Sequence, residues 1–220
     1  MNNILKKIQE INIKQIQKDI IIGTLLGDSK IVANKNKTAS IVFEQSNSHK
    51  LYLESLFSEM KDLINQSEVK EQKRLDKRYN NKVNISYWFT TKSTEFFNLY
   101  FTLFYKKNDS TNKYYKIVPD CIYDLLSPCA LAYWICDDGS KVKRGGVTLC
   151  TDSFNQDEVF KLKSVLEIKY NLICTIHKKK NRTGNNKIYY RIYISGKSLA
   201  LLISLVKEYM HPSMMYKLEE

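Results

Sequence analysis

The chain has 220 residues, a mass of 25.8 kDa and a formal net charge of +12 at neutral pH. The length allows one large core or two small ones, and the charge favours a polyanionic partner, either nucleic acid or an acidic membrane surface. No apolar run approaches the roughly 18 residues of a membrane-spanning helix, and the tyrosines spread through polar stretches favour nucleic acid over a membrane.

The first half of the chain contains five predicted elements. In chain order they are a helix over 19–27, a strand over 38–46, a helix over 49–64, a hairpin over 67–90 and a helix over 94–105. The first helix carries the apolar motif DIIIGTLLGDS and ends at Asp28.

The second half repeats this order. It contains a helix over 129–137 opened by Pro128, a strand over 146–153, a helix over 156–170, a hairpin over 173–195 and a helix over 197–210. Three motif pairs recur at similar offsets: DIIIGTLLGDS with ALAYWICDDGS, NNKVNISYWFTTKS with NNKIYYRIYISGKS, and KYYK with MMYK. We therefore predict two related half-domains, 1–127 and 128–220.

Both predicted hairpins are strongly basic. Alternate side chains of a strand share one face, so about half of these charges can form a common surface, and two such ribbons would make a basic saddle for duplex DNA. The candidate DNA contacts are Lys70, Lys73, Arg74, Lys77, Arg78, Lys82, Lys178, Lys180, Arg182, Lys187 and Arg191.

Asp28 and Asp138 end the two apolar helices, where the helix dipole already places partial negative charge. Gly23 and Gly27 allow close backbone approach, and Tyr133 and Asp137 occupy the equivalent positions of the other helix. Packing at a pseudo-two-fold axis would bring the two acids together, and Mg²⁺ would relieve their repulsion and support phosphodiester hydrolysis. Asp137 diverges from Asp138 by about 100° on a helix, so we interpret it as a capping residue or as one that supports the metal ligands from behind.

The stretches IIGTLLGDS and LAYWICDDG, with KIVP and the terminal PSMMYKL, resemble the LAGLIDADG homing endonucleases, in their monomeric two-motif form. The resemblance implies an α+β fold of tandem αββαββα half-domains with antiparallel DNA-binding sheets forming a saddle. It also implies cleavage of both strands of a long, non-palindromic duplex DNA with Mg²⁺, leaving 3′ overhangs, with Mn²⁺ or Ca²⁺ as substitutes in binding.

The same resemblance implies a set of site residues. Asp28 and Asp138 would be metal ligands, and the residues before them, Gly27 and Asp137, would complete the metal site. In the omega-intron branch of the family a lysine lies beside each half-site, which matches Lys116 and Lys217. Polar residues after each signature helix would add Gln45 and Asp152.

Two alternatives stay open. An intron maturase would use the same fold to bind intron RNA, and a DNA-binding regulator would explain the charge but not the paired acids. Five cysteines without C-x-x-C spacing and three dispersed histidines predict a reducing compartment and no zinc site. The excess of Lys, Asn and Ile suggests an A/T-rich gene, and hence a mitochondrion or another organelle.

Overall fold

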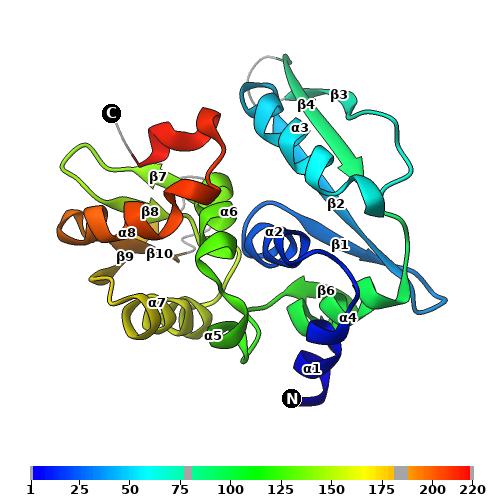
Figure 1. Cartoon of the computed structure of the whole chain (residues 1–220), viewed down its shortest axis with the longest axis horizontal. Helices are drawn as coiled ribbons and strands as arrows, with labels where there is room; N and C mark the ends of the chain where they lie inside the picture. The colour runs from blue at the N-terminus through cyan, green and yellow to red at the C-terminus, as the bar shows by residue number, and fades with distance from the viewer. Residues whose placement is uncertain (1, 77–80, 181–187, 219–220) are drawn as a thin grey trace.

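The computed structural model describes residues 2–76, 81–180 and 188–218, which form two halves side by side (Figure 1). The first half contains α1 (Asn2–Glu10), α2 (Gln15–Leu26), β1 (Lys30–Ala33), β2 (Ala39–Ser46), α3 (Lys50–Glu59), β3 (Lys70–Asp76), β4 (Lys82–Thr90), α4 (Glu95–Phe104), β5 (Tyr105–Asn108) and β6 (Lys113–Lys116). The second contains α5 (Ile122–Leu125), α6 (Pro128–Asp138), β7 (Gly139–Lys141), β8 (Val147–Leu149), α7 (Gln156–Tyr170), β9 (Cys174–Lys180), β10 (Ile188–Ile194), α8 (Leu199–Val206) and a last 3-10 helix (Pro212–Lys217).

Each half is built on a four-stranded antiparallel sheet. The strand orders are β1-β2-β4-β3 and β7-β8-β10-β9, so corresponding strands occupy corresponding places. This confirms the α+β class and the tandem arrangement of related halves.

Each sheet has one more strand than the residue pattern predicted. The strands β1 and β7 precede the predicted strands and have only four and three residues. In β1 only Ile31 is buried, so this strand lacks a hydrophobic alternation strong enough to be recognised. The hairpin of β5 and β6 and the helices α1 and α5 were also missed.

The helices α2 and α6 lie against each other where the halves meet (Figure 1). Both are apolar and buried around most of their circumference, because each packs on its partner helix as well as on its own half. The start of α6 is fixed by Ser127, whose hydroxyl accepts a hydrogen bond from the Ala130 amide, and by Pro128 in the first turn.

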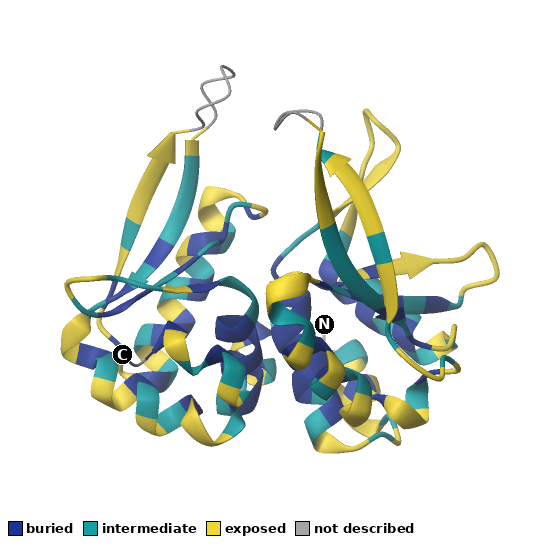
Figure 2. Cartoon of the chain, turned by 90° about the horizontal axis from the view of Figure 1, so that it is seen from above, coloured by how far each residue is buried: buried dark blue, intermediate teal, exposed yellow. Residues whose placement is uncertain are grey.

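The sheets bury one face against helices and leave the other open. Along β2 buried residues alternate with more exposed ones, and Phe43 stacks on Phe89 of β4 with ring centroids 4.7 Å apart. Figure 2 shows the two long hairpins rising from the same side of the molecule, above the helices that hold most of the buried residues. In each hairpin one strand, β3 or β9, is mostly exposed, and its partner, β4 or β10, is mostly of intermediate exposure. No helix in the described ranges is long and apolar enough to cross a membrane.

Candidate active site and nucleic-acid interface

The glycines of α2 lie close against α6. A Cβ atom on Gly23 would lie 2.2 Å from the Ala130 carbonyl oxygen, and one on Gly27 would lie 2.5 Å from Cβ of Asp137. Side chains larger than hydrogen cannot fit there without displacing α6. The prediction that small residues of one helix face larger ones of the other is confirmed.

The Asp137 side chain crosses from α6 into the first half. Its carboxylate accepts hydrogen bonds from the Asp28 amide (3.0 Å), from Nε2 of Gln45 (3.1 Å) and from the Tyr52 hydroxyl (3.1 Å). Burial raises the pKa of Asp137 well above its usual value, and the nearby Asp28 carboxylate adds to the effect. Asp137 lies inside α6, whose C-cap is Gly139, so it does not cap its own helix and instead links the two halves.

Asp28 and Asp138 occupy different environments. Asp28 is exposed, and its carboxylate accepts a hydrogen bond of 3.0 Å from Nε2 of Gln45. Asp138 is half-buried, and its pKa rises to about 7, mainly through burial and next through the negative charge of Asp28. The electrostatic coupling means that the two carboxylates belong to one centre, which a cation would stabilise.

A lysine binds the carbonyl end of each of these helices. Nζ of Lys116 donates to the carbonyl oxygens of Gly27 (2.9 Å) and Ser29 (2.8 Å). Nζ of Lys217 donates to the carbonyl oxygens of Cys136 and Asp137, the latter at 3.0 Å. The positive charges offset the negative ends of both helix dipoles, which is one reason that acids are tolerated there.

Lys116 is half-buried, and burial lowers its pKa while the negative charge of Asp138 opposes the change. The desolvation cost of the lysine is offset by the two carbonyl oxygens that it contacts and by the nearby negative charge. Both predicted lysines lie at the centre, at positions related by the repeat.

The two residues predicted after the signature helices differ in role. Gln45 contacts both Asp28 and Asp137, and its Oε1 lies 3.2 Å from Nδ1 of His49, whose Nε2 lies 3.1 Å from the Tyr216 hydroxyl. In the sequence His49 is only one of three dispersed histidines, so this network was missed. Its spacing of four residues from Gln45 is the one signal that could have indicated it.

Asp152 forms an ion pair with Arg191 instead. The guanidinium donates from Nε to Oδ1 at 2.7 Å and from an Nη to Oδ2 at 2.5 Å. The pair occupies the second half, where Thr151 turns its hydroxyl to the Tyr190 carbonyl oxygen. The surroundings of Asp28 and Asp138 are therefore chemically different.

The donor set of this centre fits a hard divalent cation shared with water and phosphate. Two carboxylates from facing helices supply the oxygen ligands that Mg²⁺ prefers, and Mg²⁺ usually completes its coordination with water and substrate. The carbonyls of Gly27 and Asp137 already accept lysine hydrogen bonds. Among the described residues no three His, Cys, Asp or Glu side chains gather as a closed metal cage.

In the first sheet the strand register divides the predicted DNA contacts between two faces. Lys70, Arg74 and Lys82 share a face with Trp88, opposite the face that buries Phe89. Lys73 falls on the Phe89 side of the sheet and pairs with Glu71 at 3.2 Å. These residues therefore do not form one surface.

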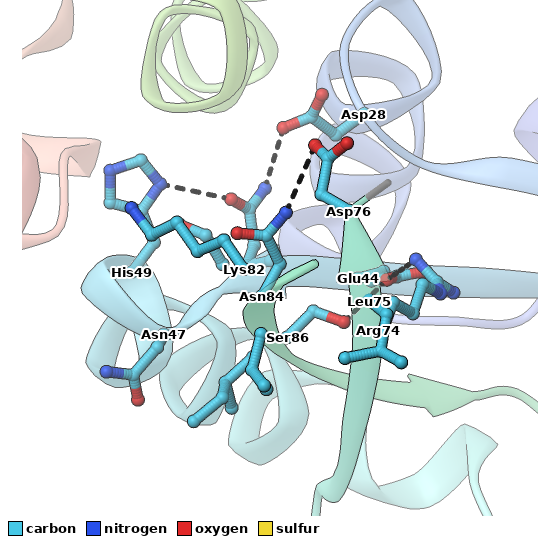
Figure 3. A pocket seen from close by; sticks show the side chains of 14 residues that line it. Asp28, Glu44, Asn47, His49, Arg74, Leu75, Asp76, Lys82, Asn84 and Ser86 are labelled. Carbon is cyan, nitrogen blue, oxygen red and sulfur yellow. Dashed lines mark hydrogen bonds and ion pairs between the residues drawn. The ribbon is translucent and has the colours of Figure 1, made fainter. Parts of the chain in front are cut away.

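Arg74 is held by a carboxylate. It donates to both oxygens of Glu44, at 2.6 and 3.2 Å, in a bidentate pair that fixes the guanidinium. Figure 3 shows Arg74, Lys82, His49 and Asp28 around one pocket, so the exposed sheet face leads directly to the acidic centre.

In the second sheet the register also separates neighbouring lysines. Arg191 and Lys179 lie on the face away from buried Ile192, whereas Lys178 and Lys180 lie on the same face as Ile192. Lys179 was not among the predicted contacts, because three consecutive lysines give no indication of which one lies on the open face. Four further predicted contacts, Lys77, Arg78, Arg182 and Lys187, lie outside the described residues.

Comparisons with known proteins give a consistent result. Residues 18–202 match the model of the LAGLIDADG DNA endonuclease family. The DNA endonuclease I-ChuI of Chlamydomonas applanata is 28% identical over 214 residues, covering 95% of this chain and 97% of that protein. The cytochrome b mRNA maturase bI2 of Debaryomyces hansenii is 34% identical over 203 residues, covering 91% of this chain and 72% of that protein.

A solved structure is similar over nearly the whole chain. The homing endonuclease I-WcaI bound to its DNA recognition sequence has a TM-score of 0.80 with this chain and 29% sequence identity. The match covers 97% of this chain and 91% of that one.

Proposed function

The chain belongs to the LAGLIDADG DNA endonuclease family, and we propose that it is a monomeric homing endonuclease. It hydrolyses both strands of a long, non-palindromic duplex with a divalent cation and leaves 3′ overhangs. The observation that carries the proposal is the pairing, in both halves, of a carboxylate at the end of an interface helix with a lysine on that helix's carbonyls. Binding alone needs neither feature, since phosphate contacts require only cations and neutral donors.

Each residue has a role in this hydrolysis. Asp28 and Asp138 would hold Mg²⁺, whose chemistry there would be to neutralise phosphate charge and to activate a water. Gln45 holds the Asp28 carboxylate in place through its amide, at 3.0 Å. Lys116 and Lys217 place positive charge beside the helix ends and stabilise negative charge that develops on the phosphate.

The exposed sheet faces supply duplex binding. The two hairpins rise on one side of the molecule (Figure 2), and the face with Lys70 and Lys82 borders the pocket that contains Asp28. Different side chains on the two sheets support a non-palindromic target. The I-WcaI structure, with DNA bound, supports this mode of binding.

The decisive test replaces each metal-binding carboxylate. Asp28→Asn and Asp138→Asn should abolish double-strand cleavage of a randomised duplex library with Mg²⁺. Both variants should still bind the duplex that the wild type cleaves, as measured by filter binding. Asp157→Asn, an exposed substitution on α7, is the matched control and should cleave as the wild type does. Undiminished cleavage by either site variant would refute the metal assignment.

A second candidate function is intron maturation. Similarity to the bI2 maturases of Debaryomyces hansenii and Saccharomyces cerevisiae, each 34% identical, favours this function. The chain spans only 46% of the Saccharomyces cerevisiae protein. Tight binding and splicing of an intron RNA by the Asp28→Asn variant would identify this activity independently of cleavage. Both functions suit an intron-encoded protein of a mitochondrion or another organelle.

A further inference from the structure

A third basic hairpin lies outside both DNA-facing sheets. It consists of β5 and β6, which follow α4 and form a separate two-stranded sheet among the described residues (Figure 1). The corresponding stretch of the second half, 207–217, has nearly the same length but forms short 3-10 helices. Both stretches end in the lysine that binds the carbonyl end of an interface helix. The two stretches are therefore equivalent in position, but only the first of them forms a hairpin.

One face of the hairpin is anchored to the fold by aromatic contacts. Tyr105 stacks on Phe101 with centroids 5.0 Å apart, and Tyr114 meets the same ring edge-on at 4.9 Å. The Tyr105 hydroxyl accepts a hydrogen bond of 3.1 Å from the Ile31 amide. These contacts hold in place a two-stranded ribbon that would be marginally stable alone.

The other face is basic and open. Cross-strand pairing places Lys106 opposite Tyr115 and Asn108 opposite Lys113 on this face, and all four are exposed. Within the described part of the chain neither lysine forms an ion pair. The only acid of the hairpin sequence is Asp109, in the turn.

The base of the hairpin lies at the acidic centre. Lys116 is the last residue of β6, and its Nζ is 2.9 Å from the carbonyl oxygen of Gly27, the residue before Asp28. Four strand residues span roughly 13 Å, so the open face begins within that distance of the centre. A duplex seated on Asp28 would therefore come within reach of Lys113 and Tyr115.

We propose that this open face, formed by Lys106, Asn108, Lys113 and Tyr115, is a third binding surface for the phosphate backbone of duplex DNA, next to the cleavage centre. Lysine, asparagine and tyrosine side chains are usual donors to phosphate oxygens, and such contacts fix the position of the duplex without reading sequence. The surface deepens the proposed function and rests on it, because the ligand is the duplex that enters that centre.

The test is the salt dependence of duplex binding by Lys106→Ala/Lys113→Ala/Tyr115→Phe, with a non-specific 40-base-pair duplex as ligand and no metal. The association constant K falls as salt rises, and losing two lysine contacts should make the slope of log K against log salt shallower by about 2. Binding should also weaken by about tenfold or more at moderate salt. The matched control, Lys61→Ala/Lys197→Ala, removes two exposed lysines outside the hairpin and should keep the wild-type slope.

The outcomes separate this surface from the nuclease proposal. An unchanged slope and affinity, in a variant with the wild-type melting temperature, would overturn the surface, whether or not the wild type cleaves DNA. Weakened binding of intron RNA with unchanged binding of duplex DNA would also overturn it. Loss of cleavage in Asp28→Asn with normal DNA binding would support the nuclease proposal and would not affect the proposed third binding surface. If the triple variant fails to fold, Lys106→Gln/Lys113→Gln gives the same reading.

Discussion

Asp138 and Lys116 are both placed where solvation opposes their charge. Burial raises the pKa of the acid to about 7 and lowers that of the lysine, and each reduces the other's shift. Such opposed shifts in one cluster are typical of catalytic sites, where charge is arranged for a ligand and not for stability. The fold tolerates them through the carbonyl contacts of Lys116 and Lys217.

We expect Asp138→Asn to stabilise the metal-free protein at pH 8. The folded-state pKa of about 7 lies above the unfolded value, so the carboxyl group's contribution is complete below pH 4 and is lost as pH rises through 7. Removing the charge should raise the unfolding free energy at pH 8 by up to about 4 kcal/mol.

Urea denaturation in the presence of a chelator at pH 5 and pH 8 measures this effect. The difference between Asp138→Asn and the wild type should shrink at pH 5, and Asp157→Asn should show no such pH dependence. An Asp138→Asn protein that is less stable than the wild type at pH 8 would contradict the assigned protonation behaviour.

The helices α2 and α6 illustrate what a sequence pattern can predict. Their apolar runs, small residues and terminal acids indicated two equivalent helices packed at a pseudo-two-fold axis. The sequence could not predict which hairpin side chains lie on the open face of the sheet. In β9 three consecutive residues are lysines, so the alternation of side chains along the strand leaves no difference between the two faces. The buried Ile192 on the neighbouring strand decides which of them faces the open side.

The close packing of these helices predicts a large effect of one methyl group. Gly23→Ala would place Cβ 2.2 Å from a backbone carbonyl oxygen of α6, which cannot rotate away. We expect a loss of about 3 kcal/mol in unfolding free energy, measured by urea denaturation. Gly196→Ala, whose Cβ would meet its nearest atom at 3.3 Å, should lose much less. Equal losses in the two variants would contradict the packing argument.

At the scale of the molecule, the repeated motifs predicted two related halves and a common centre. They could not predict the side-chain hydrogen bonds that cross between halves, because Asp137 reaches Tyr52 and His49 reaches Tyr216 over separations that no local pattern encodes. The metal and DNA contacts of the individual residues stay predictions, as does the boundary at residue 127.

The fragments 1–127 and 128–220 should not be independent. Separation would expose the apolar faces of α2 and α6 and leave the Asp137 carboxylate without its three donors. We expect each fragment alone to lack a cooperative thermal transition, and their mixture to recover one, as measured by circular dichroism. A cooperative transition in both isolated fragments would show that the junction contributes little.

The crossing of Asp137 over Gly27 has a consequence for pairing. Two copies of the second half, brought together in the same way, would set one buried carboxylate against another, and two copies of the first would set glycine against glycine with no acceptor for either Asp28 amide. Only the mixed pair satisfies both sides. The junction therefore favours the pairing of unlike halves, and we expect a chimaeric chain assembled from foreign halves to need this glycine and this aspartate together.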